Sequence, residues 1–213
     1  ESASLLHDGA EHEPRSLAGN PSILWVGRLI ESKDPLCAID AFHACAPRLP
    51  HAQLHLLATD RTLEPMVRAR IAALGPAAAA VHVHDPVAHA DMASWYAAAD
   101  VYLSTSRREG SNYSLIEALS CGCAPAVSDI PPHRAIVGSL AAPFAVGDAH
   151  AAAEAIVAAS TLPRAAASAH SHQHLGWPAV ARQTARRLLD PCVRKGCQHR
   201  LTWPRGLRPA RSL

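Results

Sequence analysis

Residues 23–26 read Ile-Leu-Trp-Val, and they are followed by Gly27 and, from Pro35, by apolar residues at helical spacing. Four apolar residues in a row leave no polar face for solvent, so this run is typical of a strand buried on both sides of a sheet. Proline fits the first turn of a helix, because its missing N–H would have no partner there. The stretch therefore predicts one strand followed by one helix.

The same unit recurs along the chain. We expect strands at 23–26, 53–57, 81–84, 101–105 and 124–127, and helices at 35–49, 63–74, 89–98, 113–121, 148–160 and about 178–189. This alternation predicts an α/β fold with a parallel sheet and helices on both of its faces. Ligands of such sheets bind beyond the carboxyl ends of the strands. The loops at 27–33 and 106–112 are therefore the candidate site.

Composition excludes several classes of protein. The 213 residues are 49% hydrophobic and 18% charged, which excludes a disordered chain. No window approaches the length of apolar sequence that a membrane helix needs. Residues 1–181 hold 11 Lys and Arg against 17 Asp and Glu, whereas residues 182–213 hold 9 against 1. This basic tail lacks interleaved aromatic residues apart from Trp203, so we do not expect nucleic-acid binding.

Cysteine and histidine do not form a metal motif. Cys37 and Cys45 lie in an apolar helical pattern, which favours buried free thiols and a cytoplasmic location. The pair His82 and His84 is expected on a sheet face, and the run from His170 to His174 in a polar loop. Because no carboxylate stands at ligand spacing, we expect no metal site.

The stretch from Glu109 to Glu117 is the most informative motif. Gly110, Ser111 and Asn112 are small and polar, so their backbone N–H groups can face an anion at the start of a helix. The two glutamates, eight positions apart, can hold separate hydroxyl groups of one ligand. The alternative is a capping box in which Ser114 and Glu117 only satisfy the end of the helix.

Arg28 and Lys33 are the cations of the first loop. Opposite a helix N-terminus they can neutralise a diphosphate. The alternative is that Arg28 pairs with Glu31 or Asp34 at the surface. The chain contains neither a dinucleotide-binding nor a P-loop glycine motif, and it has no G-x-S-x-G nucleophile motif.

Taken in order, these motifs resemble the carboxyl-terminal, donor-binding domain of a family-4 glycosyltransferase with the two-domain GT-B architecture. The matching stretches are I-L-W-V-G-R-L-I-E-S-K-D-P from residue 23, D-M-A-S-W-Y-A-A-A-D-V-Y-L-S-T-S from residue 91 and E-G-S-N-Y-S-L-I-E-A-L-S-C-G from residue 109. The resemblance covers about residues 6–189. It implies a Rossmann-like fold that is one half of a GT-B enzyme.

The resemblance also implies roles for single residues. Arg28 and Lys33 match the pair that holds the donor diphosphate, Glu109 matches the glutamate facing the donor sugar, and Glu117 matches the glutamate that binds the ribose. The loop that contacts sugar and phosphate corresponds to Gly110, Ser111, Asn112, Tyr113 and Ser114. Such enzymes transfer a sugar from a UDP-, GDP- or ADP-sugar with retention of configuration, and they need no metal or other cofactor.

The resemblance divides the chain into four segments. We expect an interdomain remnant at 1–20, the nucleotide-sugar-binding domain at 21–175, a closing helix at 176–190 and an irregular basic tail at 191–213. Residues 6–11 look like the family's interdomain segment, so we expect an N-terminal domain as partner. Without it, we expect weak nucleotide-sugar binding and no turnover. The parent enzyme would be cytoplasmic, with peripheral attachment to the inner face of the membrane as an alternative.

Two departures and two rival functions remain. The family usually has glycines where residues 58–61 read Ala-Thr-Asp-Arg, and another where residues 85–87 read Asp-Pro-Val. Both departures leave the identity of the base open. The rival functions are a nucleotide-sugar 2-epimerase of the same fold and a non-catalytic interaction module.

Overall fold

The structure is a computed structural model in which residues 15–175 are described. Three predicted segments lie outside the described residues: the interdomain segment at 6–11, the helix at about 178–189 and the tail at 191–213. Among residues 15–175, no helix has the length and apolar character needed to cross a membrane.

Five parallel strands form the sheet, as predicted. They are β1 (Ser22–Gly27), β2 (Gln53–Ala58), β3 (Val81–His84), β4 (Val101–Ser104) and β5 (Ala124–Val127). Their order across the sheet is β3-β2-β1-β4-β5, with β1 at the centre. Because β1 pairs with β2 on one side and with β4 on the other, the order of the strands reverses at β1. The loops that follow β1 and β4 therefore lie side by side, which is where open α/β sheets bind their ligands.

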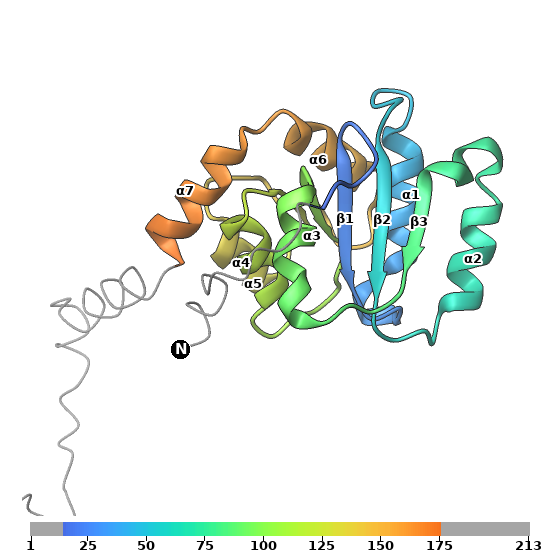
Figure 1. The fold of residues 1–213 in the computed structure, drawn as a ribbon, viewed down its shortest axis with the longest axis horizontal. Helices are drawn as coiled ribbons and strands as arrows, with labels where there is room; N and C mark the ends of the chain where they lie inside the picture. Colours follow the sequence, from blue (N-terminus) through green and yellow to red (C-terminus); the bar gives the residue numbers. More distant parts are fainter. Residues whose placement is uncertain (1–14, 176–213) are drawn as a thin grey trace, which may run out of the picture. The chain divides into compact units, whose positions relative to one another are not determined.

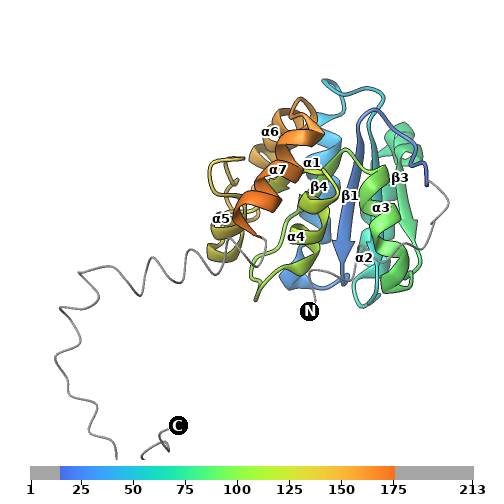
Figure 2. The ribbon, with the colours of Figure 1, turned by 60° about the vertical axis from the view of Figure 1, so that its left-hand side comes forward.

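Helices cover both faces of the sheet (Figures 1 and 2). One face packs against α1 (Pro35–Cys45), α2 (Glu64–Ala72) and α6 (Ala149–Ser160), and the other against α3 (Met92–Ala98), α4 (Tyr113–Ser120), α5 (Pro131–Val137) and α7 (Arg164–His174). Neighbours in β1 show why both faces must be covered: Trp25 belongs to the first apolar cluster and Leu24 to the second. The run at 23–26 is apolar throughout because each of its residues faces a layer of helices.

The starts of the helices follow their capping residues. Asp34 is the N-cap of α1, and its carboxylate accepts a hydrogen bond from the N–H of Cys37 at 3.3 Å. Asp148 caps α6 in the same way. Helix α1 ends at Cys45 rather than at the predicted residue 49, because Pro47 has no backbone N–H with which to continue the helical hydrogen bonds.

Two helices, α5 and α7, are absent from the sequence-based prediction. Helix α5 has only seven residues and opens with two prolines, so its pattern resembles a turn. Helix α7 buries only Ala167 and Ser171, which leaves no apolar stripe to detect. The prediction of a polar loop around His170 is therefore wrong: its imidazole Nε2 lies 2.7 Å from the carbonyl oxygen of Ile136 and joins α7 to α5.

Candidate functional site

The loops after β1 and β4 are hydrogen-bonded to each other at the carboxyl edge of the sheet. The hydroxyl of Thr105 lies 3.0 Å from the carbonyl oxygen of Lys33 and 2.8 Å from that of Asp34. The backbone N–H of Arg107 donates to the carbonyl of Ser32 at 2.9 Å. The two loops therefore form one platform, although about 70 residues separate them in the sequence.

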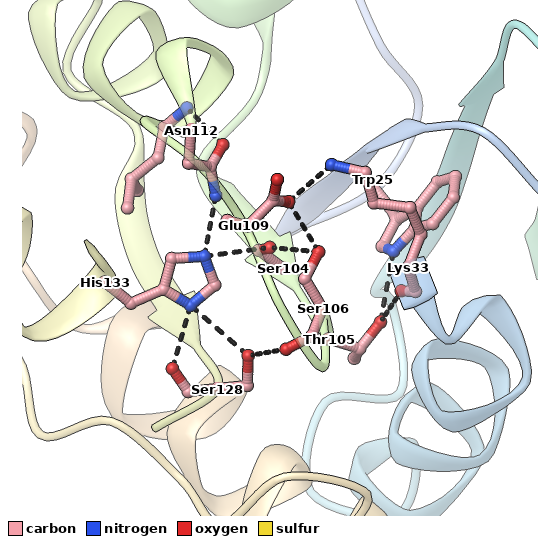
Figure 3. Close-up of polar contacts among 10 residues, drawn as sticks. Trp25, Lys33, Ser104, Thr105, Ser106, Glu109, Asn112, Ser128 and His133 are labelled. Atoms are coloured by element: carbon pink, nitrogen blue, oxygen red, sulfur yellow. Dashed lines mark hydrogen bonds and ion pairs between the residues drawn. The ribbon is translucent and has the colours of Figure 1, made fainter. Parts of the chain in front are cut away.

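An ion pair between Lys33 and Glu109 connects the platform (Figure 3). Lys33 follows β1 and Glu109 follows β4, so the fold brings together two residues that were predicted from separate motifs. The Glu109 side chain is 11% exposed and that of Lys33 is 21% exposed. Ser106 donates a second hydrogen bond to the same oxygen of Glu109 at 2.7 Å. The carboxylate is thus held by two partners at the carboxyl edge of the sheet.

Asn112 begins α4 and sets the shape of the loop before it. Its backbone is left-handed, with φ of 39°, and its side-chain oxygen accepts a hydrogen bond from the N–H of Leu115 at 3.3 Å. Ser114 therefore lies inside the helix, and the capping-box alternative for Ser114 and Glu117 is wrong. Gly110 and Ser111 are exposed, and Tyr113 is 68% exposed. These residues are available to a ligand at the positive end of the helix dipole.

Glu117 lies in the second turn of α4 and is held by residues from the preceding helical segments. The hydroxyl of buried Tyr96 donates to its carboxylate at 3.2 Å, and Nε2 of His89 lies 3.8 Å from the other oxygen. Burial raises the pKa of Glu117, and this effect exceeds the opposing ones of His89 and Tyr96. Glu117 is a partly desolvated acceptor and suits a neutral hydroxyl-bearing partner.

Arg28 is exposed and makes no ion pair with any residue between 15 and 175. The alternative pairing of Arg28 with Glu31 or Asp34 is therefore wrong. Asp34 instead lies 2.7 Å from Nη2 of Arg107, at an angle that gives an ion pair without a hydrogen bond. The pKa of Asp60 is lowered chiefly by hydrogen bonds within its own loop, and the guanidinium of Arg28 adds to this effect over a longer range. Its five donors remain available to a ligand.

His133 was not predicted from the sequence, yet it lies directly behind the loop between β4 and α4 (Figure 3). It is fully buried in α5, and its two ring nitrogens lie 2.8 Å from the carbonyl of Ser128 and 2.6 Å from the side-chain amide of Asn112. Burial lowers the pKa of His133. The signal for it is the sequence Ser128-Asp-Ile-Pro-Pro-His133, in which a helix starts at prolines immediately after a strand.

The two departures from the family pattern contact each other. Arg61, which follows β2, forms ion pairs with Asp85, which follows β3, and with Glu64 at 2.6 Å. The backbone of Asp60 also accepts a hydrogen bond from the N–H of Leu29 at 2.8 Å. Where the resemblance led us to expect glycines, this chain therefore places a charged cluster beside the first loop.

Three histidines gather on the face of the sheet that carries α3. His55 and His82 are register partners on β2 and β3, and His84 follows on the same face, as predicted for the His82 and His84 pair. Nε2 of His55 lies 2.8 Å from the carbonyl of Ala18, and Nδ1 lies 3.0 Å from Nε2 of His84. His55 therefore bonds to His84 and to the backbone, and Nε2 of His82 lies 2.6 Å from the side-chain oxygen of Gln53. Within residues 15–175, no group of His, Cys, Asp and Glu has the arrangement of a metal site.

His55, His84 and His133 make stability dependent on pH. The pKa of His84 is lowered to about 4, first by burial and then by His55, and burial also lowers the pKa of His55 and His133. Unfolded histidine takes up a proton near pH 6.5, so the free energy of unfolding decreases as pH falls below that value towards about 4. We expect the melting temperature to be roughly 5 °C lower at about pH 5 than at about pH 7.5.

The His84→Gln variant is the matched control in this calorimetric comparison. It lacks the most strongly shifted group, so its melting temperature should depend less on pH than that of the wild type. Glu117 acts in the opposite direction in both proteins, because its pKa is raised. Equal pH dependence of the two proteins would contradict the assignment to His84.

Comparisons with known proteins agree with this architecture. The structure resembles sucrose-phosphate synthase from Thermosynechococcus elongatus (TM-score 0.62, 24% identity, 79% of this chain and 44% of that chain). It also resembles Anabaena Alr3699/HepE in complex with UDP and glucose (TM-score 0.65, 20% identity, 80% and 48%) and the pneumococcal O-GlcNAc transferase GtfA in complex with UDP and GlcNAc (TM-score 0.61, 17% identity, 82% and 38%). The chain spans less than half the length of these structures. At identities this low, the similarity shows a shared fold and nothing beyond it.

A comparison with curated protein sequences finds no match. A family model, in contrast, matches residues 20–161, which are two thirds of the chain and include all five strands and both loops of the platform. The model is described as Glycosyl transferases group 1. The chain therefore belongs to the group 1 glycosyl transferases.

Proposed function

We propose that this chain binds a nucleoside diphosphate sugar on the platform between the loops after β1 and β4. The observation that carries the proposal is the meeting of Lys33, Glu109 and the N-terminus of α4 at the point where the strand order reverses. A cation and a helix N-terminus suit a diphosphate, and a fixed carboxylate suits a sugar hydroxyl. The UDP and sugar bound to the structurally similar HepE and GtfA support this ligand class.

In this proposal each predicted residue keeps its role. Arg28 and Lys33 bind the diphosphate, Glu109 faces the donor sugar, and Glu117 binds the ribose. The turn of Gly110, Ser111, Asn112, Tyr113 and Ser114 contacts sugar and phosphate. When the bond to the sugar breaks, negative charge develops on the diphosphate, and Arg28, Lys33 and the start of α4 stabilise it. We propose that transfer retains the configuration of the sugar.

The acceptor side of the reaction is assigned to a second domain. Transfer requires a second wall that positions the acceptor and excludes water. The platform supplies one wall only, so the chain by itself is expected to bind the nucleotide weakly without transferring its sugar. Sugar transfer by this chain alone would contradict that division of roles.

Titration calorimetry with UDP, GDP and ADP tests the proposed function. We expect one nucleotide to bind best, and we expect the Glu117→Ala variant to bind it about tenfold more weakly, because a hydrogen bond to a charged group is lost. The affinity for inorganic pyrophosphate should not change in this variant, because pyrophosphate has no ribose.

The matched control is Glu154→Ala. Glu154 is an exposed glutamate on α6 that pairs with Arg48. Its replacement should leave both affinities unchanged. If none of the three nucleotides binds at millimolar concentration, the interaction-module alternative is favoured instead.

A further inference from the structure

His133 lies behind the loop between β4 and α4, and its hydrogen bonds define its tautomer. A carbonyl oxygen only accepts hydrogen bonds, so Nδ1 of His133 donates to the carbonyl of Ser128 at 2.8 Å. In the neutral ring Nε2 is then an acceptor, and it receives the side-chain N–H of Asn112 at 2.6 Å. The orientation of the Asn112 amide agrees with this, because its oxygen is occupied by the N–H of Leu115. One consistent hydrogen-bond pattern therefore determines the tautomer of His133 and the orientation of the Asn112 amide.

The Asn112 amide has two partners, and each needs a different end of it. Its oxygen caps α4, and its nitrogen binds His133. The backbone of Asn112 is left-handed, a conformation that asparagine adopts more readily than most residues and that contacts of its side chain hold in place here. His133 supplies such a contact from α5, an element that has no other predicted part in the site.

The same imidazole also lies against the start of the loop. Its Nε2 is 3.4 Å from the hydroxyl of Ser104, at the end of β4. Its hydrogen-bond partner Ser128 donates from its own hydroxyl to the carbonyl of Ser106 at 2.5 Å. Residues 107–111, with Glu109 among them, therefore lie between two ends that are held by Ser128 and His133 (Figure 3).

We propose that His133 is a positioning residue for nucleotide-sugar binding: as a neutral imidazole it holds Asn112, and through it the turn before α4, in the conformation that receives phosphate and sugar. This inference rests on the proposed function. His133 itself is fully buried and does not touch the ligand.

Protonation would break this arrangement. An imidazolium has an N–H on both nitrogens, so Nε2 would oppose the NH₂ group of Asn112. Rotating the amide would satisfy His133 but would place NH₂ against the N–H of Leu115 and remove the cap. Burial lowers the pKa of His133 and so favours the neutral ring; the facing charges act in opposite directions, because Lys33 lowers this pKa and Glu109 raises it. The contact therefore exists at neutral pH and is lost in acid.

Two substitutions at His133 separate its two hydrogen bonds. Glutamine places its amide near the position of Nε2, and its oxygen can accept from Asn112. Asparagine places its amide near Nδ1, where it keeps only the donor to Ser128. By calorimetry at about pH 8 with the best-binding nucleotide, we expect His133→Gln to stay within about threefold of wild type and His133→Asn to bind about tenfold more weakly.

The pH profile distinguishes this role from simple support of the fold. Between about pH 8 and about pH 5 the wild type should lose about threefold more affinity than His133→Gln, whose side chain does not titrate. The nucleotide phosphate also takes up a proton in this range, so only the difference between the two proteins is informative.

In the Asn112→Asp variant the cap is kept, but the hydrogen-bond partner of His133 becomes an anion. The affinity of this variant relative to wild type should therefore rise as pH falls. If His133→Asn does not fold, this measurement tests the positioning role of His133 in its place.

The outcomes separate the inference from the proposed function. If the wild type binds a nucleotide and His133→Asn binds it equally well, or if all pH profiles are parallel, the inference is overturned and the proposed function stands. If the wild type binds none of the three nucleotides, both are overturned. A tenfold loss in His133→Asn that His133→Gln recovers supports the inference.

Discussion

Replacing Trp25 by alanine is expected to lower the free energy of unfolding by about 3 to 5 kcal/mol. Trp25 lies on the central strand, is 1% exposed and fills the apolar cluster beneath α1 and α6. Its removal leaves a cavity where the sheet is covered by helices and cannot collapse easily. Because the total stability of a domain is about 5 to 15 kcal/mol, much of it would be lost. Urea unfolding followed by circular dichroism measures the effect.

The Trp25→Phe variant is the control for the polar part of the same side chain. The indole N–H of Trp25 donates to the hydroxyl of Thr105 at 3.2 Å, and Thr105 joins the two loops of the platform. Phenylalanine keeps most of the ring but has no donor, so we expect a smaller loss of about 1 to 2 kcal/mol. If Trp25→Ala loses less than about 1 kcal/mol, the central packing role of Trp25 is wrong.

The Arg28→Ala variant is expected to bind the best nucleotide about 10- to 100-fold more weakly, because a charge-assisted hydrogen bond contributes about 1.5–3 kcal/mol. Arg28 is exposed and has no ion-pair partner among residues 15–175, so no contact within the described part of the chain must break before it binds a diphosphate. The affinity for the free nucleoside should be unchanged. Calorimetry with nucleoside, nucleotide and pyrophosphate compares the three ligands directly.

Lys33 differs from Arg28 because it is already paired with Glu109. The Glu109→Gln variant releases Lys33, so it should bind pyrophosphate several times more tightly than wild type, whereas Lys33→Ala should bind it more weakly. Arg68→Ala is the matched control, since Arg68 is an exposed arginine on α2 that pairs with Glu64. If Arg28→Ala, Lys33→Ala and Arg68→Ala all lowered the affinity for pyrophosphate equally, the loss would reflect the net charge of the protein rather than a diphosphate site.

Much of the fold was predictable because strand and helix signals were local. The five strand predictions agree with the structure to within one residue at each end. Each of these runs is short, apolar and bounded by turn residues, so the local pattern and the burial on both faces indicate the same element. Helices α5 and α7 were missed because their stability comes from contacts with other elements, as in the hydrogen bond from His170 to the backbone of Ile136.

The sequence indicated which residue types to propose for the candidate site, but it did not indicate which residues they contact. Arg28 and Lys33 were proposed because they are the cations of the loop after the first strand, and Glu109 and Glu117 because they lie eight positions apart around a helix start. Their contacts were not predictable: Arg107 pairs with Asp34, and Tyr96 donates to Glu117. The alternative of a capping box failed because Asn112, two residues earlier than Ser114, adopts the left-handed conformation and caps the helix. Its hydrogen bond to His133 depends on a residue 21 positions away.

By itself, the sequence determined the parallel sheet, the helices on both of its faces and the two loops at its carboxyl edge. These features depend on hydrophobic period and turn residues, which act within a few positions of the chain. Only the tertiary structure decided that Lys33 meets Glu109, that Thr105 joins their loops and that His133 supports the turn before α4. These contacts arise because β1 and β4 are neighbours in the sheet while being distant in sequence, and a hydrogen bond depends on distance and angle in space.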